Sequence, residues 1–131
     1  MTSKEYLMQY KQLTTDINTA LDAALVVQDE MKKQAQLGDY EGVDSKQRQL
    51  SQLLISVHQM SDTRREIYLR IATVPDTRQR QILELRYISG FSWNEISAML
   101  FTDKRWILRQ HLKALEEFDH QKPLDVIGKT W

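Results

Sequence analysis

The chain has 131 residues, 41% of them hydrophobic and 27% charged, with four glycines and two prolines. This length suits one ordinary domain or a small domain with an appendage, and so few helix breakers favour a mostly helical chain. The absence of cysteine excludes disulfides and thiolate metal sites and is typical of a reducing compartment. No apolar run approaches the roughly 20 residues of a membrane span, and the N-terminus is unlike a signal peptide. We therefore expect a cytoplasmic protein without a membrane partner.

The formal net charge is zero, but the charges are unevenly distributed. Residues 1–44 carry eight acidic and four basic side chains, whereas residues 45–113 carry six acidic and twelve basic ones. Phosphate binding depends on locally clustered lysine and arginine, so the second segment keeps a nucleic-acid partner possible.

Residues 1–37 are expected to form one long amphipathic helix, with Ser3 as its N-cap. Their apolar residues recur at alternating steps of three and four, the spacing of a coiled-coil seam. The seam comprises Tyr6, Tyr10, Leu13, Ile17, Ala20, Ala24, Val27 and Met31, and Leu21 and Leu25 widen it.

The segment 37–45 is expected to end this helix. Gly38 and Gly42 leave helical geometry at little steric cost, and Asp44 or Ser45 can cap a second helix.

A second stripe runs from about Lys46 to Thr73, with Arg64 at one seam position that we interpret as paired locally or extended to solvent. Two stripes joined by a short turn predict an antiparallel helical hairpin over residues 1–74. A bare hairpin of this length cannot bury both stripes, so we expect a homodimer or higher homo-oligomer. The stripe consists of Leu50, Leu53, Val57, Met60, Ile67 and Ile71.

Pro75 ends the second helix, because the residue before a proline is pushed out of helical geometry, and Asp76 or Thr77 can cap the next one. Residues 75–118 then divide into three short helices. Ser89-Gly90 separates the first two, Ser92 and Glu95 form a capping box, and Thr102-Asp103 caps the last. Two helices around a short turn, the second of them basic, predict a helix-turn-helix domain.

The tail, residues 119–131, is expected to be irregular. Its apolar residues are interpreted as docking on the protein's own surface or, alternatively, on another protein; they are Leu124, Val126, Ile127 and Trp131.

The sequence offers little for catalysis. His58, His111 and His120 lack metal-ligand spacing, and no glycine-rich loop could hold a phosphate. We therefore expect neither an enzyme nor a metal or cofactor site.

The last helix separates into two faces at 100° per residue. The expected apolar face contains Ile107, Leu108, Leu112, Ala114, Leu115 and Phe118, and the opposite face contains Arg105, Trp106, Arg109, Gln110 and Lys113. Forked arginine donors suit guanine, a glutamine amide suits adenine, and lysines suit phosphates.

The expected DNA-binding residues come from that face. Lys104 and Arg105 are best placed for the groove, Arg109 and Gln110 lie one turn later, and Lys113 meets phosphate. Trp106 either contacts DNA or fills a gap in the core, and Trp93 fills the core or lies near phosphate. Ser92 and Asn94, at the start of the supporting helix, are expected at the DNA backbone.

Across Arg78 to Leu115, the pattern R-x-x-I-L-x-L-R-Y-x-x-G-x-S-W-x-E-I and the basic helix ending in A-L resemble region four of bacterial sigma factors. That resemblance implies binding at the −35 promoter element, with Gly90, Ser92, Glu95 and Ile96 architectural. Trp106 and Gln110 depart from the family pattern. The whole chain resembles small phage transcriptional regulators of the ArpU/RinA type, which implies an activator of phage or prophage late genes in a bacterial host cell.

We therefore expect a sequence-specific transcriptional regulator that binds double-stranded DNA as an oligomer and contacts host RNA polymerase. One alternative is a DNA-packaging protein such as a small terminase subunit. Another is a protein-binding anti-repressor or host-takeover module.

Overall fold

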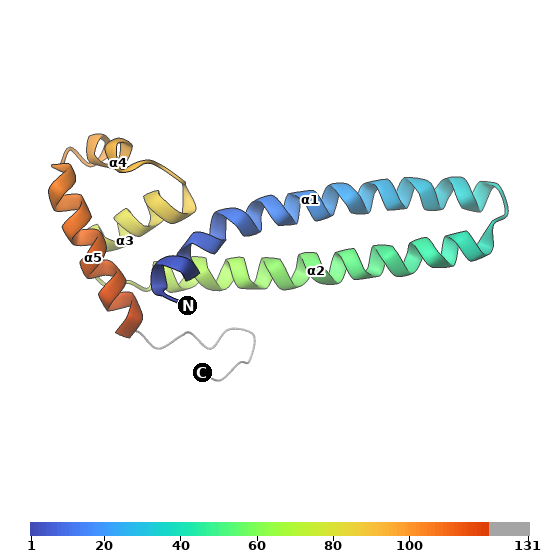
Figure 1. The fold of residues 1–131 in the computed structure, drawn as a ribbon, viewed down its shortest axis with the longest axis horizontal. Helices are drawn as coiled ribbons and strands as arrows, with labels where there is room; N and C mark the ends of the chain where they lie inside the picture. The colour runs from blue at the N-terminus through green and yellow to red at the C-terminus, as the bar shows by residue number, and fades with distance from the viewer. Residues whose placement is uncertain (121–131) are drawn as a thin grey trace. The chain divides into compact units, whose positions relative to one another are not determined.

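The computed structural model describes residues 1–120, and all regular structure within this range is helical (Figure 1). The expected all-α class is confirmed, as is a long N-terminal helical hairpin. The expected irregular tail falls, from residue 121 onward, outside the described residues. The helices are α1 (Ser3–Gln36), α2 (Tyr40–Ala72), α3 (Thr77–Leu83), the π-helix η1 (Glu84–Ile88), α4 (Trp93–Met99) and α5 (Lys104–His120).

The described chain divides into two compact units. Unit 1 combines residues 1–12 with residues 64–120, and unit 2 comprises residues 13–63. We expected a boundary near residue 75. The structure instead groups the start of α1 and the end of α2 with the C-terminal helices. Unit 1 carries twelve basic and nine acidic residues, whereas unit 2 carries four basic and eight acidic ones. The charge asymmetry of the sequence therefore matches the structural division. No helix within residues 1–120 has the length and apolar content that crossing a membrane requires.

Unit 2 is an antiparallel pair of helical segments around a small apolar core. Ala24, Val27 and Leu50 are buried there, with Met31 and Leu53 packed against them. Leu21 and Leu25, expected to widen the stripe, are 40% and 63% exposed and lie outside this core.

The hairpin turn is shorter than expected. Gly38 has a φ of +73°, and the amides of Gly38 and Asp39 donate to the carbonyls of Ala35 and Gln34. These two bonds form a Schellman motif, in which the left-handed position favours glycine. The Asp39 carboxylate accepts from the amide of Gly42 at 3.0 Å, so α2 begins at Tyr40. The expected caps at Asp44 and Ser45 were therefore wrong, because Asp39 already caps the helix one turn earlier.

At the base of the hairpin, Arg70 of α2 lies between two aromatic rings. Its guanidinium carbon is 4.7 Å from the ring centre of Tyr6 in α1 and 4.2 Å from that of Phe118 in α5. The Tyr6 hydroxyl donates to Glu66 at 2.7 Å, and burial followed by this hydrogen bond raises the pKa of Tyr6 to about 12. These contacts hold α1, α2 and α5 of unit 1 together.

The start of α1 differs from the prediction. The hydroxyl of Thr2 accepts from the amide of Glu5 at 3.2 Å, so Thr2 takes the capping position. Ser3 is buried and its hydroxyl donates to Asp119. Ser3 therefore contacts α5 and is not the N-cap that we expected.

The C-terminal helices pack around a second core in unit 1. Ile82 of α3, Ile96 of α4 and Ile107 of α5 are fully buried and contact one another. Asp76 caps α3 as expected, since its carboxylate accepts from the amide of Gln79 at 2.9 Å.

The π-helix η1 was not foreseen from the sequence. Its wider turn is closed by a bond from the Ser89 amide to the Glu84 carbonyl, and it buries Tyr87. The Tyr87 hydroxyl lies 2.7 Å from Nε2 of His111, a buried residue of α5 that also contacts the ring of Trp93. His111 is thus a packing histidine.

His111 predicts a pH dependence of stability. Burial, then the positive charges of Lys4 and Arg86, lowers the pKa of His111 from 6.5 to about 4. Between these values the unfolded chain binds one more proton than the folded protein, so stability falls as the pH drops through this window. The contribution is about 3 kcal/mol at its limit.

Chemical denaturation of the wild type and of His111→Gln between pH 7 and 4 tests this pH dependence. Glutamine keeps an acceptor for Tyr87 but does not titrate. The His111→Gln variant should therefore lack the fall in stability that the wild type shows between pH 7 and pH 5. Parallel pH profiles for the two proteins would contradict the assignment.

Candidate nucleic-acid interface

The start of α4 is defined by the expected capping box. The Ser92 hydroxyl accepts from the Glu95 amide at 3.2 Å, and the Glu95 carboxylate accepts from the Ser92 amide at 3.1 Å. Hydrogen bonding by Ser92, first through its backbone amide and then through its side chain, lowers the pKa of Glu95. The box fixes where the chain leaves the Gly90 turn, which has a φ of +80°, and enters α4.

The connection from α4 to α5 is another Schellman motif. The amides of Phe101 and Thr102 donate to the carbonyls of Ala98 and Ser97 at 3.3 and 3.1 Å. The left-handed position, occupied by Gly38 at the end of α1, is here occupied by Phe101 with a φ of +51°. The Phe101 side chain is 95% exposed, so its burial does not offset the backbone strain.

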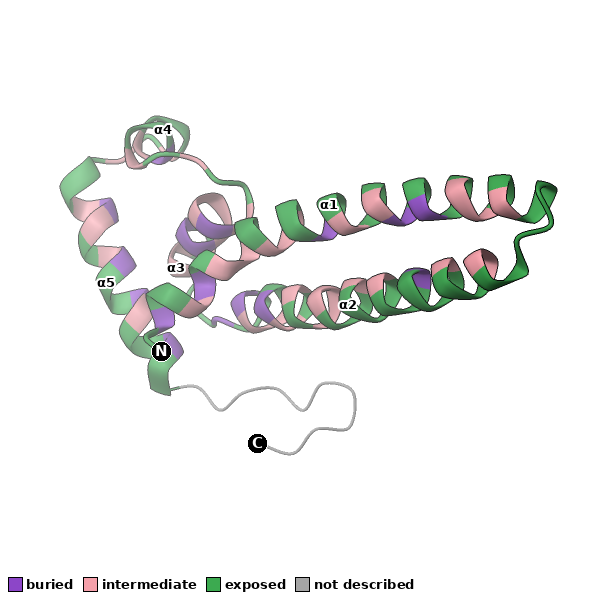
Figure 2. Cartoon of the chain, turned by 45° about the vertical axis from the view of Figure 1, so that its right-hand side comes forward, coloured by how far each residue is buried: buried purple, intermediate pink, exposed green. Residues whose placement is uncertain are grey.

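Helix α5 is packed along one side only. Its buried residues are at steps of four, three and four, which place them within about 60° of one another around the helix. Figure 2 shows them on the side of α5 that faces α3. They are Ile107, His111, Ala114 and Phe118.

The opposite side of α5 carries a row of exposed cations at steps of four, which we call the basic ridge: Arg105, Arg109 and Lys113. Lys104, the exposed first residue of α5, lies about 50° from the centre of the buried side and is not part of the ridge. Arg109 lies about 170° from the centre of the buried side. Within residues 1–120, neither Arg105 nor Arg109 has an ion-pair partner. The ridge ends at the exposed acidic residues Glu116 and Glu117.

Two residues expected on the DNA-binding face are placed differently. Trp106 is half-buried and packs against the Ile82, Ile96 and Ile107 core, with the guanidinium of Arg78 5.8 Å from its ring centre. Of the two roles expected for Trp106, the structure therefore shows the packing role in the core and not the DNA contact. Gln110 is also only partly exposed and lies at the edge of the ridge.

Leu112 was wrongly assigned to the apolar face. It is 65% exposed, because its position is about 130° from the centre of the buried side. Leu108 and Leu115, also expected to be apolar contacts, are half-buried.

The remaining candidates lie at the start of α4. Ser92 and Asn94 are exposed, but the hydroxyl of Ser92 already accepts from the Glu95 amide. Trp93 is half-buried and packs on the second core. Asn94 is thus the more available of the two polar side chains.

Sequence reasoning missed Phe101. An apolar residue directly before the Thr102-Asp103 turn was the available signal, but the left-handed backbone that makes it unusual is visible only in the structure. The Thr102 hydroxyl donates to the Leu100 carbonyl, so it braces the turn.

No group of three histidine or acidic side chains within residues 1–120 is arranged to hold a metal ion. Neither a family model, a curated protein nor a solved structure gives a significant match to the chain.

The two Schellman motifs predict opposite effects of reciprocal substitutions. Phe101→Gly should raise the free energy of unfolding by roughly 0.5 kcal/mol, because relief of left-handed strain exceeds the added entropy of the unfolded chain. Gly38→Ala should lower it by about 1 kcal/mol, since an added Cβ at Gly38 meets no atom and only the backbone is strained. Urea denaturation measures both. A destabilised Phe101→Gly variant would show that the ring is held by contacts.

Proposed function

We propose that the protein is a sequence-specific DNA-binding transcriptional regulator, in which α4 and α5 act as a helix-turn-helix and α5 enters the major groove. The observation that carries this proposal is the basic ridge. Its three cations are exposed along the side of α5 opposite the buried residues, and its arginines have no ion-pair partner within residues 1–120.

The dimensions of the ridge fit a DNA groove. Arg105 and Lys113 are eight residues apart, or about 12 Å at 1.5 Å per residue, which matches about three to four base pairs. The major groove is about 12 Å wide and admits a helix presented by one side.

The chemistry of the ridge assigns different roles along α5. Arg105 and Arg109 carry forked donors that suit guanine edges, and Gln110 at the margin suits adenine. Lys104 and Lys113 suit phosphates, which orient the helix without selecting a sequence. Asn94 at the start of α4 is a further candidate for the DNA backbone.

The resemblance to sigma region four supports a role in transcription. The resembling positions are structurally appropriate: Gly90 occupies a left-handed turn, Ser92 and Glu95 form the capping box, and Ile96 is buried. We further propose that the protein acts near a −35 promoter element, contacts host RNA polymerase and activates phage or prophage late genes.

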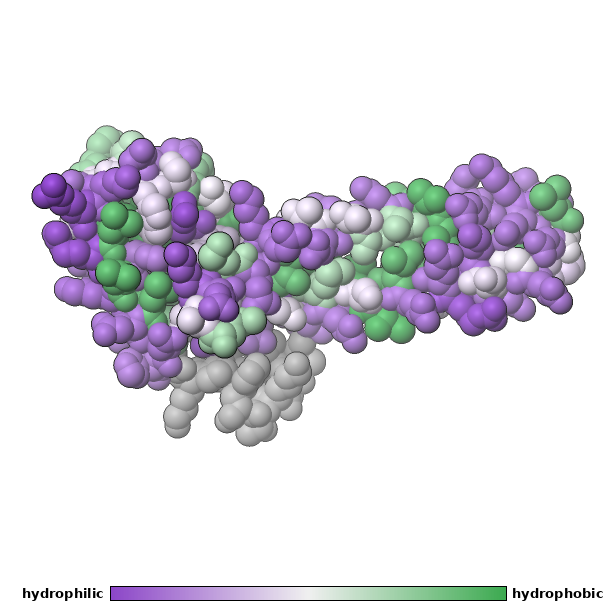
Figure 3. All heavy atoms as spheres, in the orientation of Figure 1, coloured by the Kyte–Doolittle hydropathy of each residue, from purple (hydrophilic) through white to green (hydrophobic). Residues whose placement is uncertain are grey.

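Exposed apolar residues on unit 2 support assembly with a second copy of the chain. Leu21, Leu25 and Leu54 are 40%, 63% and 46% exposed. Each comes directly after a position that faces the partner helix, so all three project toward the same side of the antiparallel pair. Figure 3 shows apolar residues on the surface around the middle of the hairpin. A dimer would present two α5 helices to two half-sites.

A protein-binding role is the second candidate. The exposed side chains of Phe101 and Leu112 favour it, because DNA binding alone does not require exposed apolar residues beside the cations of α5. A DNA-packaging subunit would differ from a regulator by forming a ring of many subunits, which a mass measurement in solution distinguishes.

Arg109→Ala tests the recognition helix. If Arg109 contacts a base, the variant should lose about 1–3 kcal/mol of affinity for the best site and discriminate less at one base pair. The site is first found by selecting bound duplexes from a random library, and affinities are then measured by fluorescence anisotropy. Arg48→Ala is the matched control, since Arg48 is an exposed arginine of unit 2. Equal affinities for Arg109→Ala and the wild type would contradict the assignment, and salt-independent binding without a selected sequence would favour the protein-binding role.

The combined variant Leu25→Gln with Leu54→Gln should shift the protein toward the monomer, because each change removes roughly 1–2 kcal/mol of apolar burial from the assembly, in proportion to the part of the side chain that is exposed in the single chain. Sedimentation velocity over a range of concentrations measures the mass. Leu37→Gln is the control, since Leu37 is 83% exposed but lies at the hairpin turn. An unchanged oligomer in the double variant would place the assembly surface elsewhere.

A further inference from the structure

An exposed leucine lies beside the arginines of the basic ridge. Leu112 of α5 is 65% exposed. At 100° per residue it lies about 20° from Arg105 and about 60° from Arg109 around the helix axis. A partner that contacts both arginines therefore also meets the side chain of Leu112.

The spacing of these residues is that of a helix read by the major groove. Arg105, Leu108, Arg109 and Leu112 follow one another at steps of three, one and three. Base-contacting residues of a recognition helix recur at these steps, because the steps keep them on one side over two turns. Leu108 is half-buried at the margin of this row, so Leu112 is its exposed apolar member.

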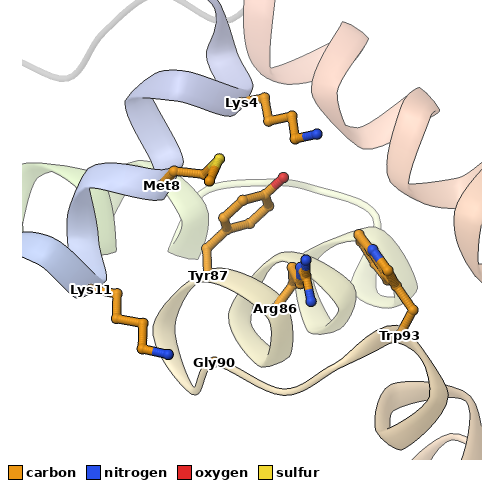
Figure 4. Close-up of a pocket in the computed structure, with 7 residues that line it drawn as sticks. All are labelled: Lys4, Met8, Lys11, Arg86, Tyr87, Gly90 and Trp93. Carbon is orange, nitrogen blue, oxygen red and sulfur yellow. The ribbon is translucent and has the colours of Figure 1, made fainter.

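Not every arginine of unit 1 is available to a ligand. Arg86 lines a pocket with Trp93, donates to the Phe91 carbonyl at 3.1 Å, and has its guanidinium 4.6 Å from the ring centre of Trp93 (Figure 4). Within residues 1–120, Arg105 and Arg109 make no such hydrogen bond or ring contact. The guanidinium groups on the side of α5 that Leu112 shares are therefore the ones that can bind bases.

The charges around Leu112 favour DNA as the partner of this leucine. Exposed Arg109 lies one turn before it and exposed Lys113 directly after it, whereas the exposed acid Glu116 lies one turn beyond. Leu112 is thus on the last turn of α5 before the charge becomes negative. The exposed leucines of unit 2 belong instead to an acidic unit, which repels the DNA backbone.

We propose that Leu112 contacts the C5 methyl group of a thymine in the major groove and selects thymine near the guanine that Arg109 reads. This inference rests on the proposed function, since it requires α5 in the groove. The thymine methyl is the apolar group that the bases present there, and contact with it removes apolar surface of both partners from water. Leu112 is about 4.5 Å from Arg109 along α5, so we expect this thymine within about two base pairs of the guanine.

The test removes the methyl group from the DNA and the leucine from the protein. Duplexes that the wild type selects from a random library supply the binding site. Each thymine of the site is then replaced in turn by deoxyuridine, which lacks only the C5 methyl group and keeps the base pair. Fluorescence anisotropy measures the affinity of each duplex for the wild type, for Leu112→Ala and for Leu37→Ala. Leu37→Ala is the matched control, since Leu37 is 83% exposed at the hairpin turn in unit 2.

One deoxyuridine should weaken binding by the wild type about fourfold, the factor expected for one buried methyl group. The same replacement should not weaken binding by Leu112→Ala, because that variant has already lost the contact. It should keep its full effect on Leu37→Ala. Equal effects of methyl removal on the wild type and Leu112→Ala overturn the inference, as does a selected site without thymine within two base pairs of the guanine. The deoxyuridine result for the wild type does not depend on the stability of any variant.

Failure of the proposed function gives a different result from failure of this inference. If the wild type selects no sequence, the regulator and the thymine contact both fail. If the wild type selects a site that Arg109→Ala binds more weakly, but no methyl effect depends on Leu112, only the thymine contact fails. Leu112 then belongs to a protein-binding surface.

Discussion

The burial of one side of α5 is the constraint on which the candidate interface depends. Ile107, His111, Ala114 and Phe118 occupy that side, and a helix that buries residues at these steps must present the opposite residues to solvent. The basic ridge is the consequence. Its exposure does not require a special conformation of any arginine, since the packing of α5 against α3 and α4 sets the direction of each side chain.

The two ends of α5 are held by different physical interactions. Near the start of α5, Ile107 joins an aliphatic core. Packing in such a core depends on the volumes of the side chains more than on the direction from which they approach. At its far end, Phe118 meets the guanidinium of Arg70, which also faces Tyr6. A cation between two rings is an attraction with defined geometry, so it fixes the end of α5 against the base of the hairpin within unit 1. Between these ends, the neutral imidazole of His111 joins α5 to η1 through Tyr87.

Unit 1 carries more basic than acidic residues, and part of this positive charge is exposed along the basic ridge of α5. Unit 2 is acidic and carries exposed leucines instead. Acidic surface repels the DNA backbone, whereas exposed leucine favours contact with another protein surface. The distribution of charge and apolar surface therefore assigns binding of anions to unit 1 and assembly to unit 2 in our proposal.

The sequence alone determined the features that depend on neighbours along the chain. Helical periodicity predicted both long helices, Asp76 and the Ser92–Glu95 box were identified as caps, and the cations of α5 were placed opposite its apolar residues. Features that depend on contacts between distant residues were decided by tertiary structure. Leu112 points away from the core because α5 is covered on one narrow side, whereas Trp106, outside the buried row, still packs against Ile82 and Ile96. The contact of Tyr87 with His111 and the position of Arg70 between Tyr6 and Phe118 bring together segments that are far apart in the sequence, and no local pattern records them.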